Sequence, residues 1–265
     1  MIVRALLGLV LAAAVSIIAR RTRSLSTSGA IAATGVGCIA VATGWTWGAL
    51  LLGYFVLSTL VSRVGRAEKE RRTATMVAKG GERDAAQVLA NGGVFAAAGL
   101  GMLALPAAGW TALAAGSLAA GSLAAAAADT WATEIGTLKG GEPRSIMTGE
   151  RLAAGTSGGV TLIGSLGAVG GAATIAVLAV ALGWPMRKAA FVFAGGVAGA
   201  FLDSILGATV QSRRWCDRCQ RETERWVHDC GTRTDQYRGL TWMDNDVVNF
   251  ISAAIGGLIA ALLTL

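Results

Sequence analysis

Residues 109–130 read GWTALAAGSLAAGSLAAAAADT, an apolar stretch that carries no charge before Asp129. A membrane-spanning helix needs about 20 predominantly apolar residues, so this stretch predicts a transmembrane helix. The rest of the 265-residue chain has the same character, since 54% of its residues are hydrophobic and only 15% are charged. Soluble domains carry about 25% charged residues. The composition therefore excludes an ordinary water-soluble enzyme, and its many apolar residues exclude a disordered chain.

Further apolar runs predict an all-α fold, a polytopic transmembrane helix bundle that forms a single integral membrane domain over residues 1–265. The candidate spans are 1–19, 28–43, 45–62, 87–105, 109–130, 158–183, 188–210 and 246–264. The region 28–62 forms either two short helices or one long bent helix, so eight helices are expected and seven are the alternative. The 37 glycines suit close helix–helix contact in lipid.

The basic residues predict the orientation of the bundle. Of 23 Lys and Arg residues, 20 lie in four polar segments, at 20–23, 63–83, 139–151 and 213–238. Because positively charged loops stay in the cytoplasm, all four segments are expected there, with both termini outside. These loops and their attraction to anionic lipid explain the net charge of +7, so no nucleic-acid partner is expected. We expect an integral protein of the cell (plasma) membrane whose first span is retained as an anchor rather than removed as a signal peptide.

Acidic side chains inside membrane spans are costly and usually functional. Asp129 and Glu134 lie one turn apart in AAAADTWATEIG (125–136), and Asp203 lies within the apolar stretch FLDSILGATVQ (201–211). Such carboxylates could hold Mg²⁺, a hard cation that prefers oxygen ligands. For Asp129 and Glu134 the alternative is a helix end that simply emerges into water. Apolar sequence on both sides of Asp203 makes that alternative harder to apply there.

Polar side chains also open the last span, in WMDNDVVNFIS (242–252). Asp244 or Asn245 is expected to cap this helix, which is a structural role. Capping needs only one of these side chains. Asp246 and Asn249, three residues apart on one helix face, are therefore candidates for a binding role.

A second polar stripe begins the span at 87–105. Asp84, Gln87 and Asn91 share one helix face, and Lys79 and Arg83 stand just ahead of them. This pattern is typical of an anion-facing surface at a positive helix terminus. The alternative is a basic flank that snorkels to the membrane surface, with an interhelical hydrogen bond from Asn91.

A glycine-rich segment, GERLAAGTSGGV (149–160), precedes another long apolar run. Gly155, Gly158 and Gly159 would let backbone N–H groups approach a phosphate, and Thr156 or Ser157 would cap the following helix. The segment is not a Walker A loop, because no Gly-Lys-Ser/Thr follows it.

Three of the four cysteines fall in the polar segment 211–240, in the pattern Cys216-x2-Cys219-x8-His228-x-Cys230. Three thiolates and an imidazole complete a tetrahedral structural zinc site, and His228 is the only histidine of the chain. A disulfide is the competing interpretation, but thiols stay reduced in the cytoplasm, so a metal is preferred. A closed four-ligand site leaves no position for a substrate, so we assign it no chemistry. Cys38, inside a span, is expected to be an inert apolar residue.

Together these segments resemble a family of polytopic membrane proteins that includes phytyl-phosphate kinase of the vitamin E pathway and transmembrane protein 19. The resemblance rests on GERDAAQVLANGG (81–93), ADTWATEIG (128–136), RSIMTGERLAAGTSGGVTLIGSLG (144–167), FLDSILGATVQ and WMDNDVVNFIS, which run in the family's order. It implies transfer of a phosphoryl group from a nucleoside triphosphate, often CTP, to a prenyl monophosphate. The family's motif positions map to Asn91, Asp129, Glu134, Gly155, Thr156, Gly158, Gly159, Asp203, Asp244, Asn245, Asp246 and Asn249. The Cys/His cluster resembles prokaryotic members only, which argues against a catalytic role for it.

The residues and the resemblance lead to one hypothesis for the site. Asp129, Asp203 and Asp246 bind Mg²⁺, while Glu134 and Asn249 orient these ligands or bind phosphate. The phosphates are neutralised by basic side chains near the Gly155–Gly159 segment and the span at 87–105: Lys79, Arg83, Arg144 and Arg151. The prenyl tail lies between helices in the lipid, while its phosphate reaches the nucleotide.

Two other classes of protein remain open. Intramembrane carboxylates in a glycine-rich bundle also suit a proton- or ion-coupled transporter. A non-catalytic assembly protein whose zinc loop binds a partner is the third possibility. A transporter would place its acidic groups near the membrane midplane with access from both sides, whereas a kinase would gather them at one end. The sequence does not predict the prenyl chain length, the nucleotide or the oligomeric state.

Overall fold

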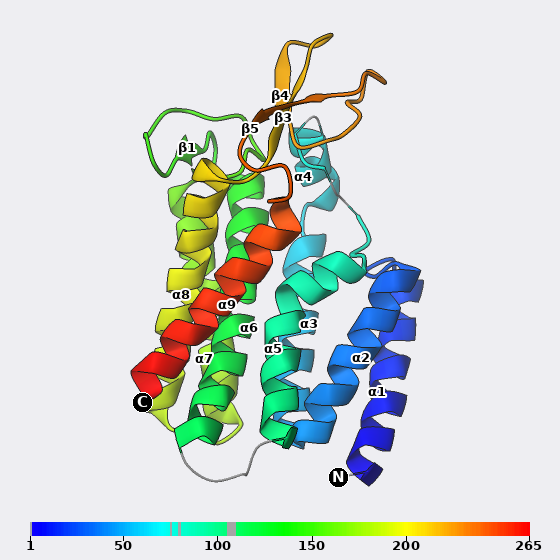
Figure 1. The fold of residues 1–265 in the computed structure, drawn as a ribbon, viewed down its shortest axis with the longest axis vertical. Coiled ribbons are helices and arrows are strands. Elements are labelled where there is room, and N and C mark those ends of the chain that lie inside the picture. Colours follow the sequence, from blue (N-terminus) through cyan, green and yellow to red (C-terminus); the bar gives the residue numbers. More distant parts are fainter. Residues whose placement is uncertain (1, 75, 79–80, 105–109) are drawn as a thin grey trace.

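A computed structural model of the chain describes residues 2–74, 76–78, 81–104 and 110–265. These residues form a helix bundle with a small strand-rich region at one end (Figure 1). The helices are α1 (Ile2–Arg21), α2 (Thr27–Thr43), α3 (Trp45–Arg63), α4 (Arg66–Thr73), α5 (Ala85–Ala104), α6 (Trp110–Lys139), α7 (Leu162–Ala181), α8 (Met186–Thr209) and α9 (Asn245–Thr264). Every predicted span corresponds to one of these helices, and only the short α4 has no counterpart among the predicted spans.

Six helices of the described residues are long and apolar enough to cross a membrane: α1, α3, α5, α7, α8 and α9. The apolar α2 is shorter, with 17 residues, and α6 is a continuous helix of 30 residues. The region 28–62 forms two helices that meet at Gly44. This region therefore forms two helices rather than one long bent helix. The described residues contain eight helices of at least 17 residues, six of which are long and apolar enough to span a membrane.

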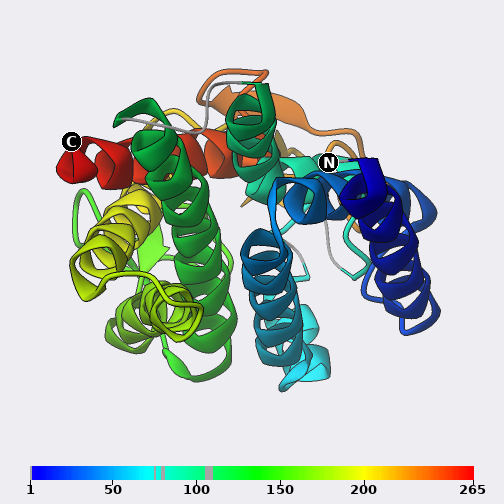
Figure 2. The same cartoon turned by 90° about the horizontal axis from the view of Figure 1, so that it is seen from below.

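The long helix α6 occupies the middle of the bundle. It packs against α7, α8 and α9 on one side and against α3 and α5 on the other, and α1 lies at the far edge against α2 (Figure 2). Small residues allow these helices to approach closely. Gly196 of α8 packs so tightly on α6 that an added Cβ would lie 2.7 Å from the Cβ of Ala124. This is the close contact that glycine allows between helices in lipid.

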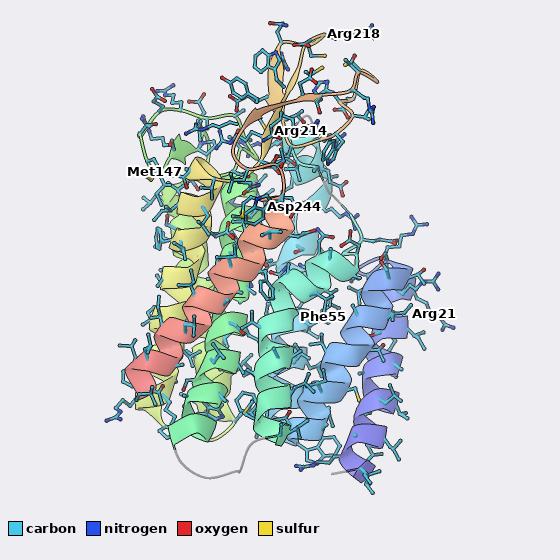
Figure 3. All side chains as sticks on the ribbon, in the orientation of Figure 1. Arg21, Phe55, Met147, Arg214, Arg218 and Asp244 are labelled. Atoms are coloured by element: carbon cyan, nitrogen blue, oxygen red, sulfur yellow. The ribbon has the colours of Figure 1, made fainter. Side chains whose placement is uncertain are left out.

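Both termini lie at the end of the bundle opposite the strands (Figure 1). The strands are β1 (Arg144–Ser145) and β2 (Gly159–Val160), which pair antiparallel, and β3 (Arg213–Cys216), β4 (Arg221–Thr223) and β5 (Asp235–Arg238), which form a sheet in the order β4-β3-β5. Basic residues from separate polar segments, Arg21 and Arg218, point outward, whereas Arg214 is buried within the strand-rich region (Figure 3). The polar segments therefore share one end of the bundle, as their charge predicted.

One expectation about a helix end is wrong, and one alternative does not hold. The helix after the glycine-rich segment begins at Leu162, and Thr161 caps it by accepting a hydrogen bond from the Gly164 N–H at 2.9 Å. Neither Thr156 nor Ser157 caps it, because the pairing of β2 with β1 keeps the chain extended up to Val160. In α6 the helix continues for ten residues beyond Asp129, to Lys139. Asp129 therefore does not lie where a helix emerges into water.

Candidate active site

A cavity of about 960 Å³ opens at the strand-bearing end of the bundle. Its walls come from α3 to α9, from the glycine-rich loop Gly155–Gly159, and from the segment 211–240, which we name the Cys/His module. Most of the predicted site residues line it: Arg83, Asn91, Asp129, Glu134, Gly155, Thr156, Ser157, Gly158, Gly159, Asp203, Asp244, Asn245, Asp246 and Asn249. Side chains that are far apart in the sequence thus meet in one cavity.

The contact between α6, α8 and α9 explains why the acidic residues converge. At Gly199 of α8, an added Cβ would lie 2.5 Å from the Cβ of Ala125 on α6 and 2.9 Å from the backbone oxygen of Ser252 on α9. Asp129 and Asp203 each follow this contact by four residues, which is one helical turn, so both carboxylates project on the same side of it. The close approach of three helices therefore carries the aspartates to one place.

The Asp203 carboxylate is held by neutral partners on α9. Its Oδ2 accepts a hydrogen bond from the Ser252 hydroxyl at 2.9 Å. With its amide nitrogen turned toward the carboxylate, Asn249 donates to the same oxygen at 3.0 Å. Neither Asp203 nor Asp129 forms an ion pair with any residue in the described part of the chain. A carboxylate in a membrane bundle without a counter-charge is costly, so this pair is suited to binding a cation.

At the start of α9, the polar cluster separates into two roles. Asp244 is the N-cap, and its Oδ1 accepts a hydrogen bond from the Val247 N–H at 3.0 Å. This confirms one of the two expected caps. Asp246 and Asn249 lie farther along the helix, and both line the cavity. Asp244 thus has a structural role and still borders the cavity.

Glu134 has a cationic partner that the sequence analysis missed. It forms an ion pair with Lys69 of α4, and the Lys69 side chain is only 8% exposed. The Lys69 ammonium also donates to the backbone oxygens of Val61 and Ser62, at 3.3 and 2.9 Å, at the end of α3. One buried lysine thus ties α3, α4 and α6 together at the cavity wall.

Several other cations that line the cavity lie near Lys69 and the end of α3. Arg83 donates to the Ser62 hydroxyl at 3.0 Å, and Arg63 donates to the Ser24 hydroxyl at 2.8 Å. Arg66 is paired with Glu70 at 2.7 Å. Of these lining residues, only Arg83 was predicted. The run of charges at 63–72 looks like a solvated face in the sequence, and only the packing of α4 on α6 places part of it in the cavity.

Two of the predicted phosphate ligands, Arg144 and Arg151, do not line the cavity. Arg144 donates to the backbone oxygen of Gly149 at 2.9 Å, and the exposed Arg151 pairs with Glu142 at 3.0 Å. Both side chains belong to the turn around β1, and neither reaches the cavity. Lys79 lies outside the described residues.

The polar stripe at the start of α5 is partly structural. The Asp84 carboxylate accepts from the Gln87 N–H at 2.9 Å, and the Gln87 side-chain oxygen accepts from the Asp84 N–H at 3.1 Å. This reciprocal pair is a capping box that begins the helix. Gln87 and Asn91 still line the cavity, with the Asn91 amide donating to the Gln87 backbone oxygen at 2.8 Å.

The glycine-rich loop is a compact turn against the end of α8. Gly155 and Gly158 have φ angles of +84° and +78°, which favour glycine. An added Cβ at Gly158 would lie 2.5 Å from the Ala208 backbone, so the loop approaches α8 as closely as glycine permits. The Thr156 N–H donates to the Ala153 carbonyl and the Gly159 N–H to the Thr156 carbonyl, both at 3.1 Å. Those two donors are therefore not available to a phosphate.

The predicted metal ligands of the Cys/His module converge. The ligand atoms of Cys216, Cys219, His228 and Cys230 all lie within 4.8 Å of one another. Cys230 Sγ is 3.5 Å from Cys216 Sγ and 3.4 Å from His228 Nδ1. Tetrahedral zinc with bonds of about 2.3 Å to sulfur and about 2.0 Å to nitrogen needs separations of about 3.8 and 3.6 Å. The cluster could therefore hold a metal ion after small adjustments.

The environment of the module shifts the pKa values of three of its groups. Hydrogen bonds from Thr232 lower the pKa of the Cys230 thiol to about 5. A hydrogen bond with Cys230 raises the pKa of the Cys219 thiol to about 11. Burial raises the pKa of Glu224 to about 7, although its hydrogen bond with Ser157 and the nearby Arg213 act in the opposite direction. Glu224 lines the cavity and was missed by the sequence analysis.

The fold and the cavity define a polytopic membrane protein with a polar site at one end of its helix bundle, lined by carboxylates from α6, α8 and α9 and by cations from α3 and α4. The chain belongs to the family described as integral membrane protein DUF92, whose sequence model matches residues 10–257. This confirms the membrane-protein family that the motifs indicated.

Two relatives match nearly the whole chain. It is 30% identical to Protein PGR of Arabidopsis thaliana, over 94% of this chain and 92% of that protein. It is 28% identical to the Uncharacterized membrane protein MJ0933 of Methanocaldococcus jannaschii, over 99% of this chain and 95% of that protein. No solved structure matches the chain significantly.

Proposed function

We propose that this protein is a Mg²⁺-dependent kinase of prenyl monophosphates such as phytyl or geranylgeranyl phosphate. A nucleoside triphosphate, with CTP favoured, supplies the phosphoryl group. An oxygen of the prenyl phosphate attacks the γ-phosphorus, the bond from this phosphorus to the β-γ bridging oxygen breaks, and a prenyl diphosphate and a nucleoside diphosphate leave. The observation that carries this proposal is one cavity lined both by basic side chains and by Asp129 and Asp203, two carboxylates that form no ion pair within the described part of the chain.

The residues of the cavity suit this reaction. Asp129, Asp203 and Asp246 offer hard oxygen donors that would hold Mg²⁺, which would neutralise charge on the transferred phosphoryl group. Arg63 and Arg83, which line the cavity near the end of α3, would position the phosphates. The acceptor phosphate is already ionised near pH 7, so no strong general base is required.

The orientation of the bundle follows from the same proposal. Nucleotides are supplied from the cytoplasm, and the four basic segments lie at the cavity end, where the positive-inside rule would place the cytoplasm. The prenyl tail would remain between helices in the lipid while its phosphate enters the cavity. A coupled transporter would need access to its carboxylates from both ends, and the gathering of acidic groups at one end favours the kinase.

The test uses the full-length protein purified in detergent. It is incubated with phytyl or geranylgeranyl phosphate, Mg²⁺ and either CTP or ATP, and the prenyl diphosphate and nucleoside diphosphate are quantified. Asp203→Asn should lower turnover by at least about 100-fold, because an electrostatic ligand in the site is lost. The matched control is Asp235→Asn on the exposed strand β5, which should leave turnover unchanged.

The outcomes separate two parts of the proposal. An absence of product with either nucleotide and either acceptor would contradict the kinase. Product formation that Asp203→Asn leaves unchanged would contradict the assignment of the metal ligands.

A further inference from the structure

Glu224 joins the Cys/His module to the glycine-rich loop. Its carboxylate accepts a hydrogen bond from the Ser157 hydroxyl in that loop. The Gln211 amide, on a residue only 2% exposed, donates to Ser157 Oγ at 2.7 Å and to Glu224 Oε1 at 3.0 Å. Three side chains from two segments therefore form one closed network at the cavity wall.

The backbone of the loop is held from the same side. Arg213, which is 7% exposed, donates to the Ser157 backbone oxygen at 2.6 Å and to the Gly207 backbone oxygen at 3.2 Å. Arg213 therefore links the loop to the end of α8. The module thus contributes both a side-chain contact and a backbone contact to the loop.

The module also holds the chain segment that follows α4. The Glu224 N–H donates to the Met76 backbone oxygen at 2.9 Å, and the Arg225 guanidinium donates to the Val77 backbone oxygen at 2.9 Å. Val77 lines the cavity, as the glycine-rich loop does. Residues 224–225 thus contact two cavity walls at once.

The contacts of Glu224 and Arg225 lie inside the stretch that the metal ligands enclose, whereas Gln211 and Arg213 precede it. Cys216 ends β3 and pairs in register with Arg221 of β4, and Glu224 follows β4 four residues before His228. A segment of about thirty residues is too small to form its own core, so a bound metal would be needed to fix its shape. A metal at the cluster would therefore also fix the position of Glu224.

We infer that Glu224 is a positioning residue, which anchors the glycine-rich loop to the Cys/His module so that metal binding at the cluster orders a wall of the cavity. This gives the module a role in the reaction without placing it in contact with the reacting atoms. The consequence for turnover rests on the proposed function, whereas the anchoring of the loop does not.

The first experiment measures hydrogen–deuterium exchange of the full-length protein in detergent. Glu224→Ala should speed exchange in residues 153–160 by about tenfold, the effect expected from the loss of one hydrogen bond to a charged group. Glu224→Gln keeps an oxygen that can accept from Ser157 and Gln211, so it should restore protection. Asp235→Ala, in the same module but exposed, is the matched control.

The second experiment addresses the metal. Zinc content is measured in the purified protein, and exchange in residues 153–160 is compared before and after treatment with a chelator under reducing conditions, and after zinc is added back. We expect bound zinc, faster exchange in the loop on its removal, and recovery on its return. Cys230→Ser should reproduce the effect of the chelator, while Cys38→Ser, in α2, should not.

In a kinase assay, Glu224→Ala should raise KM for the nucleotide by about tenfold with little change in kcat, because binding rather than chemistry depends on the loop. If the wild type shows no turnover, the proposed function fails while the exchange data still decide the anchoring. Exchange in Glu224→Ala that equals the Asp235→Ala control, or zinc removal that leaves the loop protected, would overturn the inference.

Discussion

Replacing Gly199 by alanine tests whether close helix packing places the carboxylates. In the structure, the new Cβ would lie 2.5 Å from the Cβ of Ala125, 2.9 Å from the Ser252 oxygen and 3.3 Å from Gly256 Cα. Carbon atoms in contact are separated by about 3.5–4.0 Å, so α8 must move away from α6 by about 1–1.5 Å. Two of the three obstructing atoms belong to the backbone and cannot move aside as a flexible side chain could.

Two consequences of this displacement can be measured. Overpacking of this kind costs about 1–3 kcal/mol in the free energy of unfolding. The hydrogen bond from Ser252 to Asp203, 2.9 Å long, would be stretched beyond the about 3.5 Å limit for a hydrogen bond. A shift of about 1 Å in a catalytic group can lower turnover by about 100-fold.

The assay combines thermal unfolding in detergent with the kinase assay. The matched control is Gly101→Ala on α5, where an added Cβ meets nothing within 4 Å. Because alanine favours helix over glycine by about 1 kcal/mol, this control should be unchanged or slightly more stable. If Gly199→Ala were as stable and as active as Gly101→Ala, the packing account of the site would be refuted.

Two further predictions follow from the charged groups at the cavity. Lys69→Met leaves Glu134 without its cation and should lower the free energy of unfolding by about 2–4 kcal/mol. Glu134→Gln should cost less, because Lys69 keeps its two backbone acceptors. Equal losses of the two variants in chemical unfolding would contradict this prediction. Burial raises the pKa of Glu224 from 4.5 to about 7, so the folded state binds this proton more tightly than the unfolded state does. The stability that this provides is fully present below pH 4.5 and is lost as the pH rises through 7. The Tm should therefore fall between pH 6 and pH 8 more in the wild type than in Glu224→Gln. If the Tm of both proteins changed equally with pH, Glu224 would not be the group that titrates.

The sequence predicts the helices of this protein well, because a membrane span requires an apolar run of about 20 residues, which is visible in the sequence. It also predicts that Asp129 and Asp203 are functional, since a carboxylate in such a run is costly. Their convergence could not be predicted in the same way. Periodicity tells which residues share a helix face, but which helices pack together depends on contacts such as that of Gly199 with Ala125.

The charged loops were predicted less well. The prediction that Arg144 and Arg151 neutralise phosphates in the cavity is wrong, because the turn around β1 directs them away from it. Lys69 and Glu224 were missed because each lies among other charged residues, where a side chain looks solvated whether it is or not. In polar segments, the pattern of residue types carries little information about burial.

Two acidic residues of α6, Asp129 and Glu134, differ in how their charge is compensated. Glu134 is neutralised by Lys69, whose ammonium is fixed by two carbonyls at the end of α3, so this pair forms a rigid part of the wall. Asp129 has no ion-pair partner among the described residues and faces the carboxylate from α8. A bound cation would compensate the carboxylate charge where no fixed charge does so, and none is needed where a lysine already does. A divalent ion should therefore bind at Asp129 and Asp203, so exchanging Mg²⁺ for Mn²⁺ should broaden the nuclear magnetic resonance signals of labels near these two residues more than signals near Lys69. Equal broadening of the signals near Lys69 and near the two aspartates would contradict a metal site at Asp129 and Asp203.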